Sequence, residues 1–77
     1  MVEKVSIKLT LPDEAIEVLE FLEKRGINWW SGTKASKLIP YLPCYLIIHE
    51  ENGRKYLTWD KYPRGYVISK SELWKRF

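Results

Sequence analysis

Hydrophobic and polar residues alternate along the first ten positions of the chain. The alternation places three aliphatic residues on one side of an extended backbone and three polar residues on the other: Val5, Ile7 and Leu9 against Lys4, Ser6 and Lys8. A period of two residues is typical of a strand with one buried and one exposed face. The pattern therefore predicts a half-buried strand at the start of the sequence.

The next segment, residues 11–26, has the period of an amphipathic helix. Pro12 suits the first helical turn, and acidic and basic residues lie at the ends that the helix dipole favours for each. Gly26 is placed to adopt the left-handed conformation that ends many helices. The predicted helix presents five apolar residues on one face: Ala15, Ile16, Val18, Leu19 and Leu22.

Two adjacent tryptophans follow this helix, in the stretch INWW. In a short strand, Ile27 and Trp29 share one face and Trp30 lies on the other. We therefore expect Trp29 in the core and Trp30 at the surface. The segment after them is predicted to be a loop, because Pro40 and Pro43 interrupt any continuous central strand.

Residues 44–61 contain a strong hairpin pattern. Asn52-Gly53 is a preferred pair for a two-residue turn in which both residues have positive φ, and this turn fixes the strand register. His49 is then predicted to face Tyr56. The face assigned to the core carries Leu46, Ile48, Leu57 and Trp59. The opposite face carries Tyr45, Ile47, His49, Tyr56 and Thr58.

The last part of the chain predicts a turn at residues 62–65, a short strand and a terminal helical turn. Ser69 and Glu72 have the spacing of a capping box before an apolar pair. The elements together predict an α+β fold with the order β-α-β-β-β, one helix packed on the sheet and a short C-terminal helical turn. We expect residues 1–77 to form a single domain.

Composition narrows the cellular setting more than the function. The chain has 77 residues, of which 45% are hydrophobic and 14% aromatic, with a net charge of +3. This modest charge does not predict a dedicated nucleic-acid binder. With the single cysteine Cys44, no disulfide forms within the chain, and no apolar run is long enough to span a membrane. The sequence therefore predicts a cytoplasmic protein with no membrane association.

The residue types that usually carry catalysis or bind metal are sparse. Cys44 and His49 lie five residues apart in one predicted strand, so they point to opposite faces. Zinc sites usually need four such ligands, and a nucleophile–base pair needs the two groups in contact. The sequence therefore predicts no catalytic residues, no metal site and no cofactor, and hence a protein that is not an enzyme.

Aromatic residues interleaved with basic ones suggest binding surfaces instead. Such residues can stack on bases and hold phosphates, and they also form hot spots of protein interfaces. The candidate binding residues come from the loop after the tryptophan pair and from the later turn: Trp30, Ser31, Lys34, Tyr41, Tyr62, Arg64 and Tyr66. A second patch is predicted on the exposed sheet face: Tyr45, His49 and Tyr56.

The stretch Gly26-Ile27-Asn28-Trp29-Trp30-Ser31-Gly32 reads G-x-x-W-x-S-G directly after an amphipathic helix. In this it resembles a group of small bacteriophage-encoded proteins that share the order strand, helix, G-x-x-W-x-S-G, loop, hairpin and closing segment. The resemblance concerns Gly26, Trp29, Ser31 and Gly32, and Trp30 occupies a free position. It implies a phage origin and the cytoplasm of an infected cell, with no common activity.

Four hypotheses follow. The first is a non-enzymatic phage protein that binds and inhibits a host protein, with a defence component as the favoured target. The second is a binder that sequesters a signalling nucleotide, with a homo-oligomer supplying the depth of its pocket. The third is a single-stranded nucleic-acid-binding module that uses the exposed sheet face. The fourth is a structural accessory domain whose aromatic rings all lie in the core.

Overall fold

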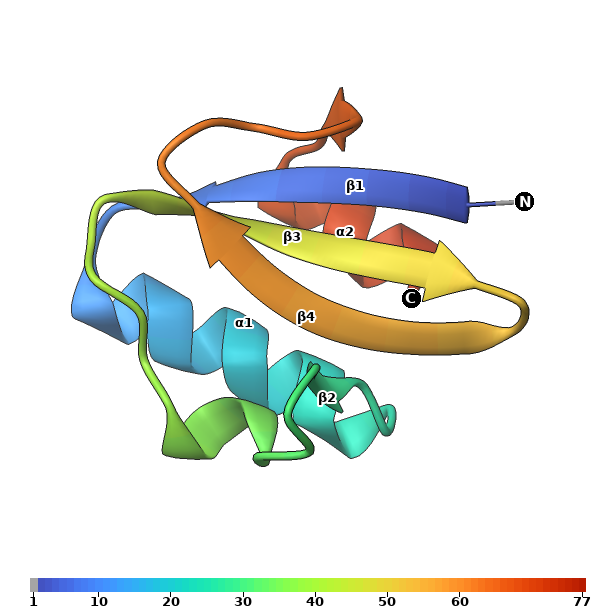
Figure 1. Ribbon diagram of the computed structural model, residues 1–77. Helices are drawn as coiled ribbons and strands as arrows, with labels where there is room; N and C mark the ends of the chain where they lie inside the picture. The colour runs from blue at the N-terminus through green and yellow to red at the C-terminus, as the bar shows by residue number, and fades with distance from the viewer. Residues whose placement is uncertain (1) are drawn as a thin grey trace.

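The structure is a computed structural model that describes residues 2–77. Five strands form one mixed sheet, and two helices cover one of its faces (Figure 1). The elements are β1 (Val2–Leu9), α1 (Pro12–Lys24), β2 (Asn28–Trp29), the 3-10 helix η1 (Ala35–Lys37), β3 (Cys44–Glu51), β4 (Arg54–Asp60), β5 (Tyr66–Val67) and α2 (Lys70–Arg76). The strand order is β2-β4-β3-β1-β5. The predicted α+β class is confirmed, and the observed order β-α-β-β-β-β has one strand more than the predicted β-α-β-β-β.

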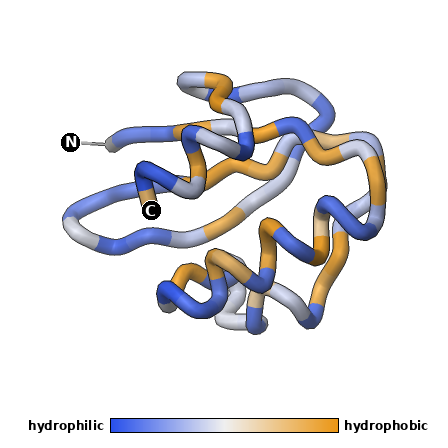
Figure 2. The backbone as a smooth tube through the Cα atoms, turned by 180° about the vertical axis from the view of Figure 1, so that it is seen from behind, coloured by the Kyte–Doolittle hydropathy of each residue, from blue (hydrophilic) through white to orange (hydrophobic). Residues whose placement is uncertain are grey.

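The core lies between the sheet and the two helices, which Figure 2 shows from the helix side. As the alternation predicts, Val5, Ile7 and Leu9 of β1 are buried there. From α1, the core receives Ala15, Val18, Leu19 and Leu22. The prediction that Ile16 belongs to this buried face is wrong, since its side chain is exposed. At about 100° per residue, Ile16 lies outside the stripe that faces the sheet.

The β3–β4 hairpin has the predicted register. Asn52 and Gly53 both have positive φ, 51° and 80°, and His49 lies opposite Tyr56. One assignment to the core is wrong: the side chain of Trp59 is 37% exposed. The strand next to β4 is β2, which pairs only with residues 56 and 57. Trp59 therefore lies beyond the end of β2 and is not covered by it. Ile47, on the opposite face, is instead buried.

A serine on that opposite face holds the segment that leads into β5. The Ser6 hydroxyl donates to the carbonyl oxygen of Arg64 at 2.5 Å and accepts from the Arg64 backbone N–H at 2.7 Å. Ser6 is fully buried, and its cross-strand partner is Ile47. The segment of residues 61–65 therefore lies over the β1 side of the sheet face that carries no helix.

The terminal helical turn is confirmed as α2. The Ser69 hydroxyl accepts from the backbone N–H of Glu72 at 3.3 Å, as a helix N-cap does. Trp74 of α2 packs edge-on against Phe21 of α1, with ring centroids 4.3 Å apart. The two helices are therefore joined on their common side of the sheet. Within residues 2–77, neither helix has the length and apolar character that crossing a bilayer requires.

We expect Gly65→Ala to destabilise the fold more than Gly32→Ala. Both glycines have positive φ, which costs an alanine about 1–2 kcal/mol. A Cβ at residue 65 would also collide with the backbone carbonyl of Lys4, whereas residue 32 has open space. Urea unfolding of the two variants measures the difference in the free energy of unfolding. Equal losses would show that the segment shifts freely away from β1.

Candidate functional site

Trp29 fixes the position of the exposed residue that follows it. The Trp29 side chain is 2% exposed, and its indole N–H donates to the carbonyl oxygen of Ala35 at 3.0 Å. The backbone N–H of Trp30 donates to the carbonyl oxygen of Leu57 in β4 at 3.1 Å. Trp30 itself is 56% exposed. The expectations of a buried Trp29 and an exposed Trp30 are therefore both confirmed.

The loop after Trp30 is fastened from two sides. The side-chain oxygen of Asn28 accepts from the backbone N–H of Ala35 at 3.0 Å. The Glu23 carboxylate accepts from the backbone N–H and the hydroxyl of Ser36, at 3.0 and 2.8 Å. These hydrogen bonds, together with the nearby lysines, lower the pKa of Glu23. Because β2 and this loop are both held, Trp30 projects from a fixed backbone.

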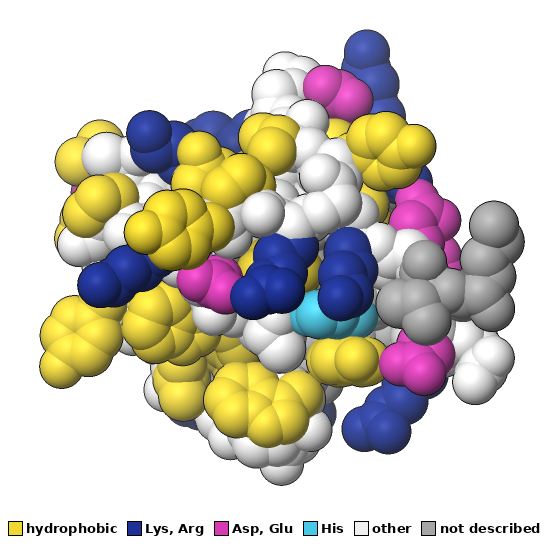
Figure 3. Space-filling model, turned by 45° about the horizontal axis from the view of Figure 1, so that its top comes forward, with side chains coloured by type: hydrophobic (Ala, Val, Ile, Leu, Met, Phe, Trp, Pro, Cys, Tyr) yellow, Lys and Arg dark blue, Asp and Glu magenta, His cyan; other side chains and the backbone are white. Residues whose placement is uncertain are grey.

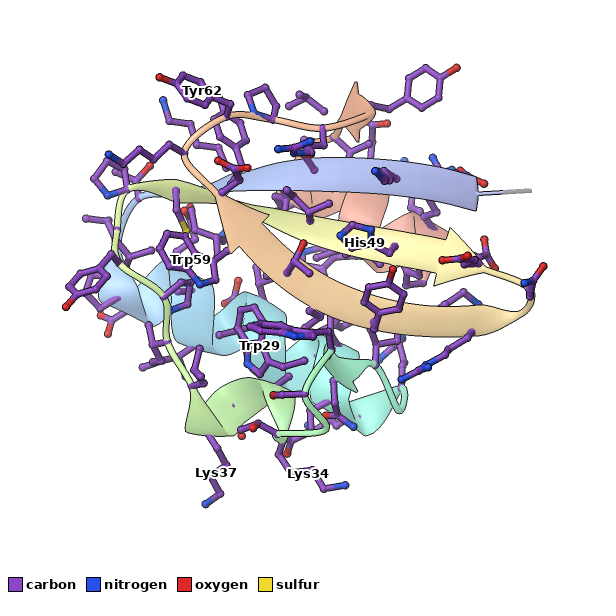
Figure 4. All side chains as sticks on the ribbon, in the orientation of Figure 1. Trp29, Lys34, Lys37, His49, Trp59 and Tyr62 are labelled. Carbon is purple, nitrogen blue, oxygen red and sulfur yellow. The ribbon has the colours of Figure 1, made fainter. Side chains whose placement is uncertain are left out.

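A stacked pair of rings occupies the centre of the sheet face that carries no helix. The rings of His49 in β3 and Tyr56 in β4 are nearly parallel, with an interplanar angle of 3° and centroids 4.6 Å apart. The His49 Nε2 atom lies 2.6 Å from the Thr58 hydroxyl oxygen. Lys4 of β1 lies opposite His49 on its other side. Figure 4 shows His49 on this face of the sheet.

A groove beside Tyr56 extends from this ring to Trp30. It has a volume of about 570 Å3 and is broadly open to solvent. Its lining residues are Trp30, Glu51, Asn52, Arg54 and Tyr56. The Arg54 guanidinium lies over the Tyr56 ring, 5.7 Å from its centroid. We call this hollow the Trp30 groove.

The electrostatic setting of His49 favours its neutral form. Burial lowers the pKa of His49, and the positive charges of Lys4 and Arg64 lower it further, against the opposing effect of Glu51. Figure 3 shows Lys and Arg side chains directly beside the imidazole. Arg64 also pairs with Asp60 at 3.1 Å, and this hydrogen bond lowers the pKa of the Asp60 carboxyl.

The structure divides the first set of predicted binding residues among separate surfaces. All seven are exposed, but Trp30 lies at the β2 edge of the sheet, and Tyr66 lies in β5 at the other edge. Lys34 points away from the sheet, as Figure 4 shows, although it is close to Trp30 in sequence. The Ser31 hydroxyl lies 3.1 Å from that of Thr33, within its own loop.

The second predicted patch lies together, because Tyr45, His49 and Tyr56 are half-buried on one sheet face. Arg64 is brought toward this face by the bonds of its backbone to Ser6. The structure therefore places Tyr56 between His49, which stacks on it, and Trp30, with which it lines a hollow, while the charge of Arg64 acts on the imidazole.

A further exposed apolar surface lies at the end of the sheet where β4 finishes. Tyr41 is 85% exposed and approaches the ring of Trp59, with centroids 6.4 Å apart. Exposed aliphatic residues stand just before Tyr41 in the chain, and Tyr62 follows the end of β4. We define the Tyr41 patch as Leu38, Ile39, Tyr41 and Trp59.

Two arrangements bear on catalysis. Cys44 is buried on the core side, away from His49, and burial raises the pKa of its thiol. The contact between His49 and Thr58 brings a hydroxyl to an imidazole, but a nucleophile–base pair also uses a group that orients the ring. Among the described residues, no such group bonds to the other ring nitrogen of His49, and no cluster of three metal-ligating side chains occurs.

Sequence reasoning missed six residues of these surfaces: Glu51, Asn52 and Arg54 in the Trp30 groove, and Leu38, Ile39 and Trp59 in the Tyr41 patch. Arg54 and Glu51 were not selected, although the predicted register already placed them opposite each other on the face of His49 and Tyr56. Trp59 was assigned to the core, and its contact with Tyr41 depends on the path of the loop before β3. Strand alternation in the hairpin could have selected Arg54 and Glu51. No local pattern in the sequence predicts the exposure of Trp59.

We expect nuclear magnetic resonance to give His49 a pKa below 6.5, because burial and two cations oppose its protonation. The unfolded chain then binds the proton more readily than the folded one. Stability should therefore fall as the pH drops from 7 through the folded pKa, and then level off. His49 is the single histidine, so His49→Gln should remove this step. A pKa at or above 6.5 would contradict the described surroundings of the ring.

Each fixed residue of the seven-residue stretch G-x-x-W-x-S-G has a structural role. Gly26 follows the end of α1 with φ of 75°, and Trp29 fills the core. Gly32 has φ of 93°, and its N–H donates to the carbonyl oxygen of Trp29 at 2.8 Å, while Ser31 contacts Thr33. These contacts explain the stretch as a means of building the turn. The chain matches no protein-family model, no curated protein and no solved structure.

Proposed function

We propose that the protein is a non-enzymatic binding protein that occupies and inhibits a host protein through the Tyr41 patch. The observation that carries this proposal is the exposure of Tyr41, 85%, beside Trp59 and two exposed aliphatic residues. Contiguous exposed apolar surface of this kind marks interaction sites. Tyrosine and tryptophan are the residue types that most often dominate the energy of protein interfaces.

The backbone of Trp59 in this patch is held by the sheet. Trp59 belongs to β4 and pairs with Leu46 of β3, which is fully buried. Pro40, next to Tyr41, is also buried. A surface whose backbone is already ordered loses less conformational entropy on binding. Trp59 is therefore presented to a partner on an ordered strand.

Charge around the patch favours an acidic partner. Lys8 and Lys61 line a small hollow with Pro43, two residues beyond Tyr41. Among the described residues these two lysines take part in no ion pair. Figure 3 shows hydrophobic side chains gathered on this side, with Lys and Arg side chains between them. A partner with an apolar centre and a carboxylate rim would complement this surface.

We place this partner in a host cell because the sequence resembles phage proteins. Small proteins without a catalytic group often act by occupying their target. A defence protein in the cytoplasm of the infected cell is the target that fits this class best. A second copy of the chain is the competing occupant of the same patch, and the experiment below distinguishes it.

We expect Tyr41→Ala to weaken capture of a host protein by more than about tenfold, since the loss of a hot-spot aromatic costs about 2 kcal/mol or more. The measurement is affinity capture from bacterial lysate, followed by titration of the identified partner. Tyr66→Ala is the matched control, because Tyr66 is an exposed tyrosine at the far edge of the sheet. The wild-type protein and this control should also inhibit the partner, whereas Tyr41→Ala should not.

Three outcomes would overturn the proposal. One is the absence of any captured partner. The second is equal capture by the wild-type protein and Tyr41→Ala. The third is a dimer, seen by light scattering, that Tyr41→Ala converts to a monomer, because the patch would then be occupied by a second copy.

A further inference from the structure

The geometry points to a second binding site: we propose that the Trp30 groove binds a nucleotide unit, with the base beside Trp30 and the phosphate at Arg54. The site shares no residue with the Tyr41 patch. Trp30 lies at the β2 edge of the sheet, whereas Trp59 lies beyond the end of β2. The proposal therefore stands or falls independently of the proposed partner protein.

Trp30 supplies an aromatic surface on a fixed backbone. Its side chain is more than half exposed, while its backbone N–H is bound to β4 and its neighbour Trp29 is buried. An exposed indole costs free energy in water, and stacking against a base recovers it. Because the backbone is already held, the indole needs little ordering when a base arrives.

Tyr56 supplies the second aromatic wall, and His49 holds it in place. The stacked imidazole covers one face of the Tyr56 ring, and Thr58 in turn bonds to His49. The phenol ring also lines the groove, so it is presented to a ligand in a defined position. Because His49 covers one face of Tyr56 and Arg54 lies over the same ring, Trp30 is the aromatic face that remains for a flat ring such as a nucleobase.

Arg54 supplies the charge for a phosphate. Its guanidinium lies over Tyr56, and among the described residues it makes no ion pair, even though Glu51 is its cross-strand neighbour. Lys55, the next residue, does pair with Glu50 on the other face, at 3.5 Å. Arginine binds phosphate in a two-pronged manner and stacks on planar rings. The free guanidinium is therefore placed to hold the phosphate of a base that lies beside Trp30.

Glu51 and Asn52 give the groove a preference among bases. The Glu51 carboxylate only accepts hydrogen bonds, and the Asn52 side chain both donates and accepts. Guanine presents two adjacent N–H donors on its Watson–Crick edge, which match the two oxygens of a carboxylate. Adenine has an acceptor nitrogen at the equivalent ring position, which a carboxylate repels. A guanine nucleotide is therefore the ligand that these side chains favour.

The size and openness of the groove agree with this ligand. Its volume of about 570 Å3 is within the usual range of small-ligand pockets, about 300–1,000 Å3. The groove is open rather than enclosed, so a bound nucleotide would keep its sugar exposed. The same chemistry is offered by a free nucleotide and by one residue of a single strand.

The first test is a titration with guanosine monophosphate, followed through the four tryptophan indole N–H signals in a nitrogen–proton correlation spectrum. The Trp30 signal should move and that of Trp29 should stay, since Trp29 is buried and bonded to Ala35. Trp30→Ala should weaken binding at least about fivefold, the lower end of the loss expected for one stacked base. Tyr66→Ala, an exposed aromatic at the other sheet edge, should leave binding unchanged.

Two further variants separate the parts of the ligand. Arg54→Ala should lower the affinity for guanosine monophosphate to about that for guanosine, and it should leave the affinity for guanosine unchanged. Lys34→Ala is the charge control, because Lys34 points away from the sheet (Figure 4). Glu51→Gln should reduce the preference for guanosine monophosphate over adenosine monophosphate. Thermal unfolding of each variant checks that the fold is retained.

Comparison with a short single strand that contains one guanine identifies the source of the nucleotide. Affinity that rises with strand length and falls steeply with salt indicates single-stranded nucleic acid. Affinity that is independent of length indicates the free nucleotide. Both results support the site. No movement of the Trp30 signal with either ligand, or equal binding by Trp30→Ala, overturns it, and equal binding of the two monophosphates overturns the role of Glu51.

Discussion

The turn at Asn52 and Gly53 is the constraint on which most of this structure depends. Positive φ at both residues sets a two-residue hairpin, and a shift of one residue would move every side chain of β4 to the other face. The register that results buries Leu57 on the helix side. It also places Tyr56 beside His49 on the other side. Core and binding surface therefore follow from one turn.

A second level of order comes from Trp29, whose burial organises the chain on both sides of it. Its indole N–H donates to the carbonyl oxygen of Ala35, and its own carbonyl oxygen accepts from the backbone N–H of Gly32. These two bonds make residues 29–35 a compact unit. This unit is bound to α1 through Glu23 and Ser36. The exposed ring of Trp30 is therefore a direct consequence of the buried ring beside it.

The sequence predicted the elements whose signals are local. The alternation in β1, the residues that begin and end α1, and the Asn52-Gly53 turn are each recognised from neighbouring residues. The structure confirms each of these three elements. The error at Trp59 has a different origin, because its exposure depends on how far β2 extends along β4. The error at Ile16 is a matter of helical angle, since this side chain lies outside the buried stripe of α1. Strand alternation alone does not show where a neighbouring element ends.

The same distinction applies to the candidate surfaces. The grouping of Tyr45, His49 and Tyr56 needed only the hairpin register, and the structure places them on one face. The grouping of Trp30 with Lys34 relied on closeness in sequence, and the fold directs these side chains apart. The contact between Tyr41 and Trp59 joins residues from a proline-containing loop and a strand end. Such a contact requires the whole tertiary structure.

The bond between Ser6 and residue 64 has a consequence for how this protein can change. The serine hydroxyl holds residue 64 by its main-chain N–H and carbonyl, so the attachment is the same for any side chain other than proline at that position. Gly65, which packs against β1, must stay as it is. The loop can therefore exchange the chemistry of the side chains at positions 62 and 64 while its path over the sheet is preserved. One buried hydroxyl thus separates the evolution of this part of the surface from the stability of the fold.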